Sequence, residues 1–228
     1  PIRQKKNAGR PRPSGAALRG LLAESWRYWT LALVGFFYTL FQFPLIAHFM
    51  GDTKTGIFRS AFLLASGVGT LYDSINWLLL PRMVNWKKQG MPFLLSQQRR
   101  LLRLFLLIGL PLTSVLALAA PWIYRIFFGS AYMDGVHIFQ ILAVGRLAVF
   151  LGQIYIWGAV AAGLDNEFLL ATTTAAVFSV TANILFIPSL GLIGVAVVNV
   201  LTEFIIGAIC WFFLNRKATI EAASVSEA

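Results

Sequence analysis

The chain has 228 residues, of which 58% are hydrophobic and 12% are charged, and its formal net charge is +10. Its mean hydropathy of +0.73 excludes an ordinary soluble domain, in which charged residues are about twice as frequent. A basic excess on so apolar a chain indicates anionic lipid headgroups as the partner of these charges, and we expect no nucleic-acid partner.

Residues 1–25 are polar, basic and rich in Pro and Gly, and they predict a cytoplasmic linker ahead of the membrane domain. Within this stretch, Leu18–Trp26 sets leucines against Arg19 and Glu24. The pattern is typical of a helix lying at the lipid headgroups, and equally of the charged beginning of a spanning helix. Phe93–Leu104, further along the chain, has the same two interpretations.

Six apolar segments follow, each close to the length that crosses the hydrocarbon core of a bilayer. They cover residues 28–50, 57–81, 104–124, 136–162, 166–187 and 192–214. The apolar runs are continuous rather than alternating, which favours helices over barrel strands. The sequence therefore predicts an all-α, polytopic membrane protein, a six-transmembrane-helix bundle over residues 26–217. A short cytoplasmic tail is expected over 218–228.

The strongest of these signals is Phe168–Thr202, which contains no charged residue and no histidine. The run is too long for one span and suits two. Its middle carries Pro188, Gly191 and Gly194, which together predict a tight turn. Residues 166–214 are thus expected to form a helical hairpin.

The Lys and Arg residues are distributed asymmetrically around the six segments. Most lie before the first segment, between the second and third, and after the last, whereas the opposite loops Gly51–Gly56 and Gly129–Gly135 hold only Lys54. Cytoplasmic loops carry such an excess of positive charge. Both termini are therefore expected in the cytoplasm, which requires an even number of spans.

Ionisable residues inside the predicted spans are candidates for function, because a charge at membrane depth costs about 3 kcal/mol or more. In the second span, Arg59, Ser66, Thr70 and Asp73 have helical spacing and share a face, which Asn76 extends. Ser66 and Thr70 taken alone are explained by helix–helix hydrogen bonds.

The fourth and sixth spans carry comparable faces. Arg146 shares its face with Gln153 and Trp157, and Glu203 shares its face with Asn199 and Thr202. One interpretation is a buried pair of Arg146 with Glu203 or Asp73 that only orients helices. The other is an aqueous cavity in which Arg146 attracts an anion while Glu203 or Asp73 takes up a proton or metal cation.

Two sets of site residues are therefore predicted. The cavity-lining set is Arg59, Asp73, Asn76, Arg146, Gln153 and Trp157. The cation-coupling set is Asp73, Asn199 and Glu203.

Enzyme chemistry is not visible in the sequence. His48 and His137 are far apart and lack metal-ligand spacing, and there is no phosphate-binding Gly-rich loop of the Walker type. We therefore expect no enzymatic activity, no metal site and no organic cofactor.

Three apolar patterns carry a family resemblance. They are Leu80-Pro81-Arg82, then Ala120-Pro121-Trp122-Ile123-Tyr124 with Phe128-Gly129 and Tyr132, and then Ala182–Pro188 followed by Gly191, Gly194 and Ala196. In this order and spacing, the chain from about Gly56 to Leu214 resembles the C-terminal half of polysaccharide and O-antigen flippases of the MOP superfamily.

The resemblance implies a carrier of polyprenyl-diphosphate-linked oligosaccharide in the bacterial inner membrane, serving polysaccharide or lipopolysaccharide biosynthesis. It implies alternating access between two six-helix lobes, coupled to an H+ or Na+ gradient. Residues 1–25 would match the linker between lobes, so the expected partner is a missing N-terminal lobe or a second copy. Two alternatives stay open: a lobe of a multidrug-efflux type cation antiporter, and a non-transporting membrane scaffold for glycan assembly. The scaffold predicts that Arg146 and Glu203 pair and enclose no solvent.

Overall fold

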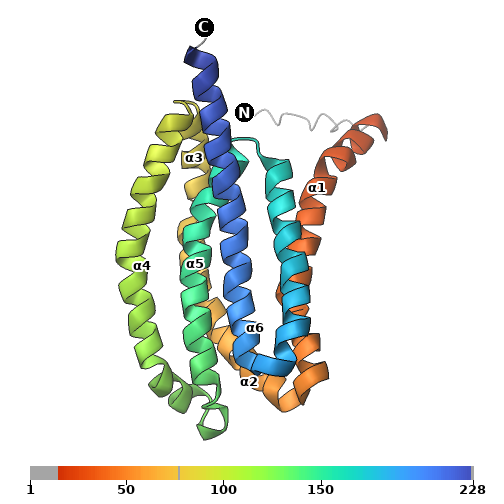
Figure 1. The fold of residues 1–228 in the computed structure, drawn as a ribbon, viewed down its shortest axis with the longest axis vertical. Coiled ribbons are helices and arrows are strands. Elements are labelled where there is room, and N and C mark those ends of the chain that lie inside the picture. Colours follow the sequence, from red (N-terminus) through yellow and green to blue (C-terminus); the bar gives the residue numbers. More distant parts are fainter. Residues whose placement is uncertain (1–14, 77, 227–228) are drawn as a thin grey trace, which may run out of the picture.

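The computed structural model describes residues 15–76 and 78–226, and this part of the chain is helical without any strand. The long helices pack side by side into a bundle (Figure 1). The elements in chain order are α1 (Gly15–Leu40), α2 (Gln42–Asn76), α3 (Leu79–Lys87), α4 (Met91–Phe127), the 3-10 turn η1 (Ser130–Tyr132), α5 (Gly135–Ala161) and α6 (Asp165–Ser226). The prediction of an all-α membrane protein is confirmed, without the exact number of spans.

Four helical segments are long and apolar enough to cross a membrane: Trp29–Ile75, Met91–Phe127, Gly135–Ala161 and Asp165–Ala223. The first and last have 47 and 59 residues. As straight helices they would measure about 70 Å or more, against a hydrocarbon core of about 30 Å. Neither segment is straight, and the exact number of spans stays a prediction.

Glycines interrupt both of the longest segments. Gly51 has φ 82° and ψ 174°, and Gly191 has φ 58° and ψ −144°, backbone conformations that favour glycine. Figure 1 shows α6 reversing its direction part-way, and α2 leaving the lower end of the bundle, where α1 arrives, toward α3. The turn predicted around Pro188–Gly194 is thus present, with its break at Gly191.

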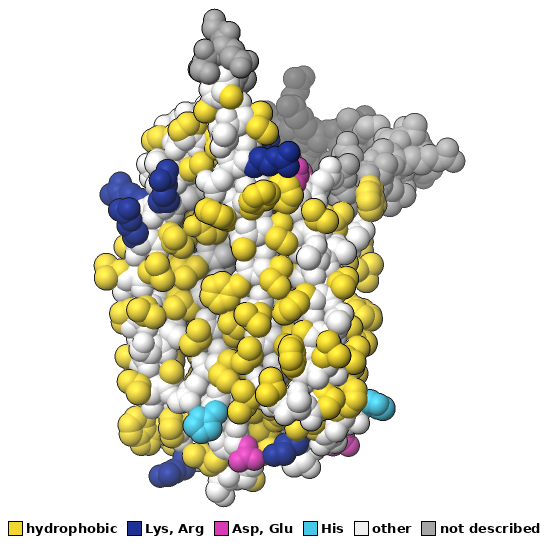
Figure 2. Space-filling view, viewed as in Figure 1, with side chains coloured by type: hydrophobic (Ala, Val, Ile, Leu, Met, Phe, Trp, Pro, Cys, Tyr) yellow, Lys and Arg dark blue, Asp and Glu magenta, His cyan; other side chains and the backbone are white. Residues whose placement is uncertain are grey.

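The two glycine bends lie at the same end of the bundle as η1. A Cβ atom on Gly191 would lie 3.3 Å from Cε of Met50, and Lys54 forms an ion pair with Asp134 at 3.2 Å. The opposite end holds α3 and the end of α6, joined by the ion pair of Lys87 with Glu221 at 2.9 Å. Hydrophobic side chains cover the middle of the face shown in Figure 2, and charged side chains gather toward its ends.

Two expected boundaries differ from the structure, and two stretches with open interpretations are continuous with long helices. The second span was expected to continue to residue 81, but α2 ends at Asn76 and α3 begins at Leu79, so Pro81 lies in the first turn of α3, where proline is tolerated. The expected tail from residue 218 continues α6 to Ser226, because this alanine-rich stretch contains no Gly or Pro. Phe93–Leu104 begins α4 without a break, and Leu18–Trp26 is likewise part of α1.

The central helix is α5, which is the most buried of the four candidate spans and contacts α2, α4 and α6. It runs parallel to the second half of α6 at close range. A Cβ on Gly207 would meet Cα of Gly152 at 3.3 Å, and a Cβ on Gly145 would meet Cγ2 of Val200 at 2.8 Å. Both pairs are 55 positions apart, as are Ala162 and Lys217, whose ammonium donates to the Ala162 carbonyl. Small residues allow this approach, as is usual between membrane helices.

Candidate functional site: a polar cavity between α1, α2, α5 and α6

A cavity of about 230 Å³ lies among four helices of the bundle. Its lining combines one arginine, two carboxylates, two amides and several aromatic rings. The lining residues are Tyr38, Thr39, Phe62, Gly69, Tyr72, Asp73, Arg146, Val149, Phe150, Gln153, Asn199 and Glu203. Asp73 is exposed, so the cavity is open to the outside of the chain.

Arg146 is held against α2 by two contacts, and it passes close to Gly69. Its Nη2 donates to Oγ of Ser66 at 3.3 Å, and its guanidinium carbon lies 5.2 Å from the ring centroid of Phe62. A Cβ on Gly69 would lie 3.3 Å from Cδ of Arg146, so the missing side chain at position 69 gives the arginine room. A cation over an aromatic face contributes about 0.5–2 kcal/mol.

The guanidinium has no carboxylate partner. The described residues place neither Glu203 nor Asp73 within the 4.0 Å of Arg146 that defines an ion pair, whereas Lys54 and Lys87 each have one. The pair that would only orient helices is therefore not formed in this structure. The positive charge of Arg146 faces a cavity instead.

Glu203 has a different partner. The hydroxyl of Tyr38 on α1 donates to Oε1 of Glu203 at 3.2 Å. A hydrogen bond to a carboxylate is roughly twice as strong as one between neutral groups. It ties Glu203 of α6 to α1.

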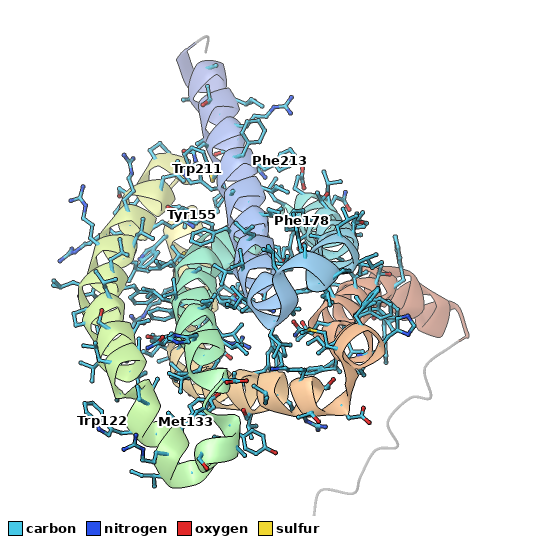
Figure 3. All side chains as sticks on the ribbon, turned by 60° about the horizontal axis from the view of Figure 1, so that its bottom comes forward. Trp122, Met133, Tyr155, Phe178, Trp211 and Phe213 are labelled. Atoms are coloured by element: carbon cyan, nitrogen blue, oxygen red, sulfur yellow. The ribbon has the colours of Figure 1, made fainter. Side chains whose placement is uncertain are left out.

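Glu203 also lines a second space. A groove of about 380 Å³ between α4, α5 and α6 is otherwise mostly apolar, and its walls include Tyr155 and Trp211 (Figure 3). Glu203 therefore borders both the polar cavity and this groove. The two spaces lie on either side of the close α5–α6 pair.

The structure gathers five of the residues singled out from the sequence. Those that line the cavity are Asp73, Arg146, Gln153, Asn199 and Glu203. Arg59 is exposed and does not line it, and Trp157 packs against the hydrophobic core instead. Asn76 is the last residue of α2, and its side chain lies outside the described residues. Thr70 is exposed and donates to the carbonyl of Ser66 in its own helix.

Sequence reasoning missed Tyr38, Phe62 and Gly69. Tyr38 is an uncharged residue in an apolar span, where tyrosine is common for packing alone. Phe62 and Gly69 carry no chemical signal, because their role comes only from the position of Arg146. Sequence periodicity cannot reveal these neighbours, because Tyr38 lies on α1 and Phe62 and Gly69 lie on α2, whereas their partners lie on α5 and α6.

No group of three or more His, Cys, Asp or Glu able to hold a metal ion occurs in the described part of the chain. In the cavity, Arg146 can bind an anion. Asp73 and Glu203 are separate carboxyl groups that can each bind a proton or a monovalent cation. Amides and aromatic rings complete a lining suited to hydroxyl-rich ligands.

A comparison with protein-family models matches residues 5–137 to the family described as polysaccharide biosynthesis protein. The match covers more than half of the chain. The chain belongs to this family. In this family member the matched region includes α1 to α4, with Tyr38, Phe62 and Asp73, whereas Arg146 and Glu203 follow it. No curated protein and no solved structure matches the chain significantly.

Proposed function

We propose that this chain is one lobe of a MOP-type flippase that moves polyprenyl-diphosphate-linked oligosaccharide across the bacterial inner membrane by alternating access. The family gives a role in polysaccharide synthesis or transport. The apolar helices, long enough to cross a membrane, favour transport of a membrane-borne intermediate. In this proposal, both termini face the cytoplasm and the lobe is the C-terminal one.

One observation supports the proposal more than any other: Arg146, which forms no ion pair with any described residue, lines a cavity inside an apolar bundle. Keeping such a charge at membrane depth is costly, and a purely structural role would be served better by a carboxylate at ion-pair distance. A diphosphate could bind the guanidinium directly, because guanidinium binds phosphate oxygens in bidentate fashion.

Asp73 and Glu203 supply the proposed coupling. With both carboxylates charged, the cavity opposes an anionic substrate. Uptake of H+ or Na+ at these acids, with Asn199 beside them, would leave Arg146 as the dominant charge and favour the diphosphate. Binding of cation and substrate would then be linked through the charge of one small space.

Efflux of organic cations is the second candidate. Two carboxylates and the rings of Tyr38, Phe62 and Tyr72 line the cavity, and aromatic faces attract cations. This alternative predicts that removing Arg146 improves transport, since the arginine repels the substrate. The scaffold alternative requires an Arg146–Glu203 pair, and the two groups are not at ion-pair distance.

The test is glycan export in a flippase-deficient strain that carries a compatible N-terminal lobe together with this chain. We expect export with both lobes and none with the 228-residue chain alone, because one lobe leaves the cavity open. Arg146→Ala should abolish export at near-normal abundance. Arg146→Lys should keep part of it, since a point charge still attracts diphosphate. Full export by the chain alone, as a monomer, would refute the two-lobe model.

A double variant separates substrate attraction from structure. If Arg146 only balances a buried acid, Arg146→Ala leaves an uncompensated carboxylate and lowers stability. Adding Glu203→Gln would then restore both abundance and export. We expect no such rescue of export, and its occurrence would reject the substrate role of Arg146.

A further inference from the structure

Another pocket lies between α3 and α4, apart from the polar cavity around Arg146. It has a volume of about 420 Å³, and three arginines, Arg82, Arg100 and Arg103, line it. None of its lining residues belongs to the cavity around Arg146. Figure 2 shows dark blue side chains grouped over the upper part of α4. We call this space the arginine pocket.

The three guanidiniums have no countercharge on the described part of the protein. Neither an ion pair nor a hydrogen bond is formed by Arg82, Arg100 or Arg103, although Lys87 nearby is paired with Glu221. All three side chains are exposed, and three like charges around one space together attract an anion more strongly than a single arginine would.

The other walls of the arginine pocket are apolar. Trp86 closes it on α3, and Leu104 and Leu107 continue it along α4. Leu104 is 48% exposed and Leu107 is 73% exposed. The same face of α4 goes on through Pro111, Val115 and Leu118 at spacings of three or four, all of them exposed. From Leu104 to Leu118 this apolar stripe is about 20 Å long.

We propose that the arginine pocket binds the phosphate headgroup of an anionic membrane phospholipid, with an acyl chain along the stripe from Leu104 to Leu118. The arginines match the charge of the phosphate, and the stripe of about 20 Å is long enough to follow an acyl chain through one leaflet, which is half of the hydrocarbon core of about 30 Å. A soluble phosphate would use the charges but leave the stripe without a role. Basic pockets at the cytoplasmic ends of spanning helices are typical sites for anionic headgroups. The inference does not depend on the transport proposal.

The test measures binding of phosphatidylglycerol and phosphatidylcholine to the purified 228-residue chain in detergent, by native mass spectrometry and by the lipid-dependent rise in melting temperature. We expect retention of phosphatidylglycerol and little of phosphatidylcholine. Each arginine near an anionic surface contributes about a fivefold factor, so replacing all three with Gln should lower phosphatidylglycerol affinity on the order of 100-fold.

A charge-matched control is available at the same end of the molecule. Lys88, Arg99 and Arg216 are exposed and do not line the arginine pocket. Replacing these three with Gln removes the same charge and should leave phosphatidylglycerol binding within a few-fold of the unmodified chain. Equal losses in the two triple variants would overturn the proposal in favour of diffuse attraction.

A competition experiment with the unmodified chain keeps the proposal testable if a variant fails to fold. Millimolar inorganic phosphate or diphosphate should not displace the bound phosphatidylglycerol, because neither occupies the apolar stripe. Displacement by either anion would identify a soluble-phosphate site and overturn the lipid assignment, as would equal retention of phosphatidylcholine.

Discussion

At the scale of single residues, the position of Arg146 depends on a side chain that is absent. Gly69 leaves room for the methylenes of Arg146, while Ser66 and Phe62 receive its guanidinium. Without that room the arginine would have to leave α2 and point elsewhere in the cavity. The glycine is thus part of the site although it carries no functional group.

Gly69→Val should therefore reduce glycan export in the two-lobe assay. Its branched side chain would displace Arg146 by about 1 Å or more, and a misplacement of that size can cost on the order of 100-fold in rate. Gly67→Val is the matched control, because nothing lies within 4 Å of a Cβ there. Both changes put the same residue into the same helix. Equal export by the two variants would show that the contact with Gly69 does not position Arg146.

The charged members of the site could be predicted from sequence, and their neighbours could not. Asp73, Arg146 and Glu203 stand out because ionisable groups are rare in apolar spans. Their convergence on one cavity needs only that polar faces avoid lipid. Tyr38 and Gly69 are ordinary in their own helices and acquire a role only across an interface. Arg59, by contrast, has the helical spacing of the polar face that includes Asp73, and it still lies outside the cavity.

At the scale of helices, the contact between α5 and the second half of α6 sets the distance between Arg146 and Glu203. Gly145 and Gly152 face Val200 and Gly207 along two turns of parallel helix. This close pair also separates the polar cavity from the apolar groove that Glu203 borders. Widening it would open a path between the two spaces and loosen the bundle.

Gly207→Leu should lower the stability of the lobe by about 1–3 kcal/mol, the usual cost of inserting bulk into a packed interface. The measurement is thermal unfolding of the purified chain in detergent. Gly35→Leu on α1 is the control, since a Cβ at that position meets nothing within 4 Å. A melting temperature unchanged by Gly207→Leu would mean that α5 and α6 separate readily.

Hydropathy was sufficient to predict that the helices exist. It did not predict where they begin and end, because helix ends depend on local residues and contacts. The hairpin bend at Gly191 was predictable because Pro188 and two glycines interrupt an apolar run. The break between α2 and α3 was misplaced, because Pro81 looks like a helix end but fits the first turn of a new helix. The continuation of α6 past residue 217 is held by tertiary contacts, including Lys87 with Glu221.

At the scale of the whole molecule, the two ends of the bundle differ in charge. One end holds the glycine bends and the loop around η1, where Lys54 and Asp134 pair. The other end holds α3, the beginning of α4 and the end of α6, with the arginine pocket between α3 and α4. Positive charge marks the cytoplasmic side, so the arginine pocket would face the inner leaflet.

Cysteine labelling in intact cells tests this orientation and the number of spans together. In a Cys210→Ala background, Thr53→Cys and Ser130→Cys should react with an impermeant thiol reagent from outside, because both positions are exposed at the end with the glycine bends. Asn85→Cys and Ser96→Cys, exposed near the opposite end, should react only after the membrane is permeabilised. Reaction at Thr53→Cys from outside, together with protection of Asn85→Cys in intact cells, would show that the chain crosses the membrane between these two positions. Labelling of Asn85→Cys or Ser96→Cys in intact cells would reverse the orientation, and protection of Thr53→Cys under both conditions would remove a pair of spans from the model.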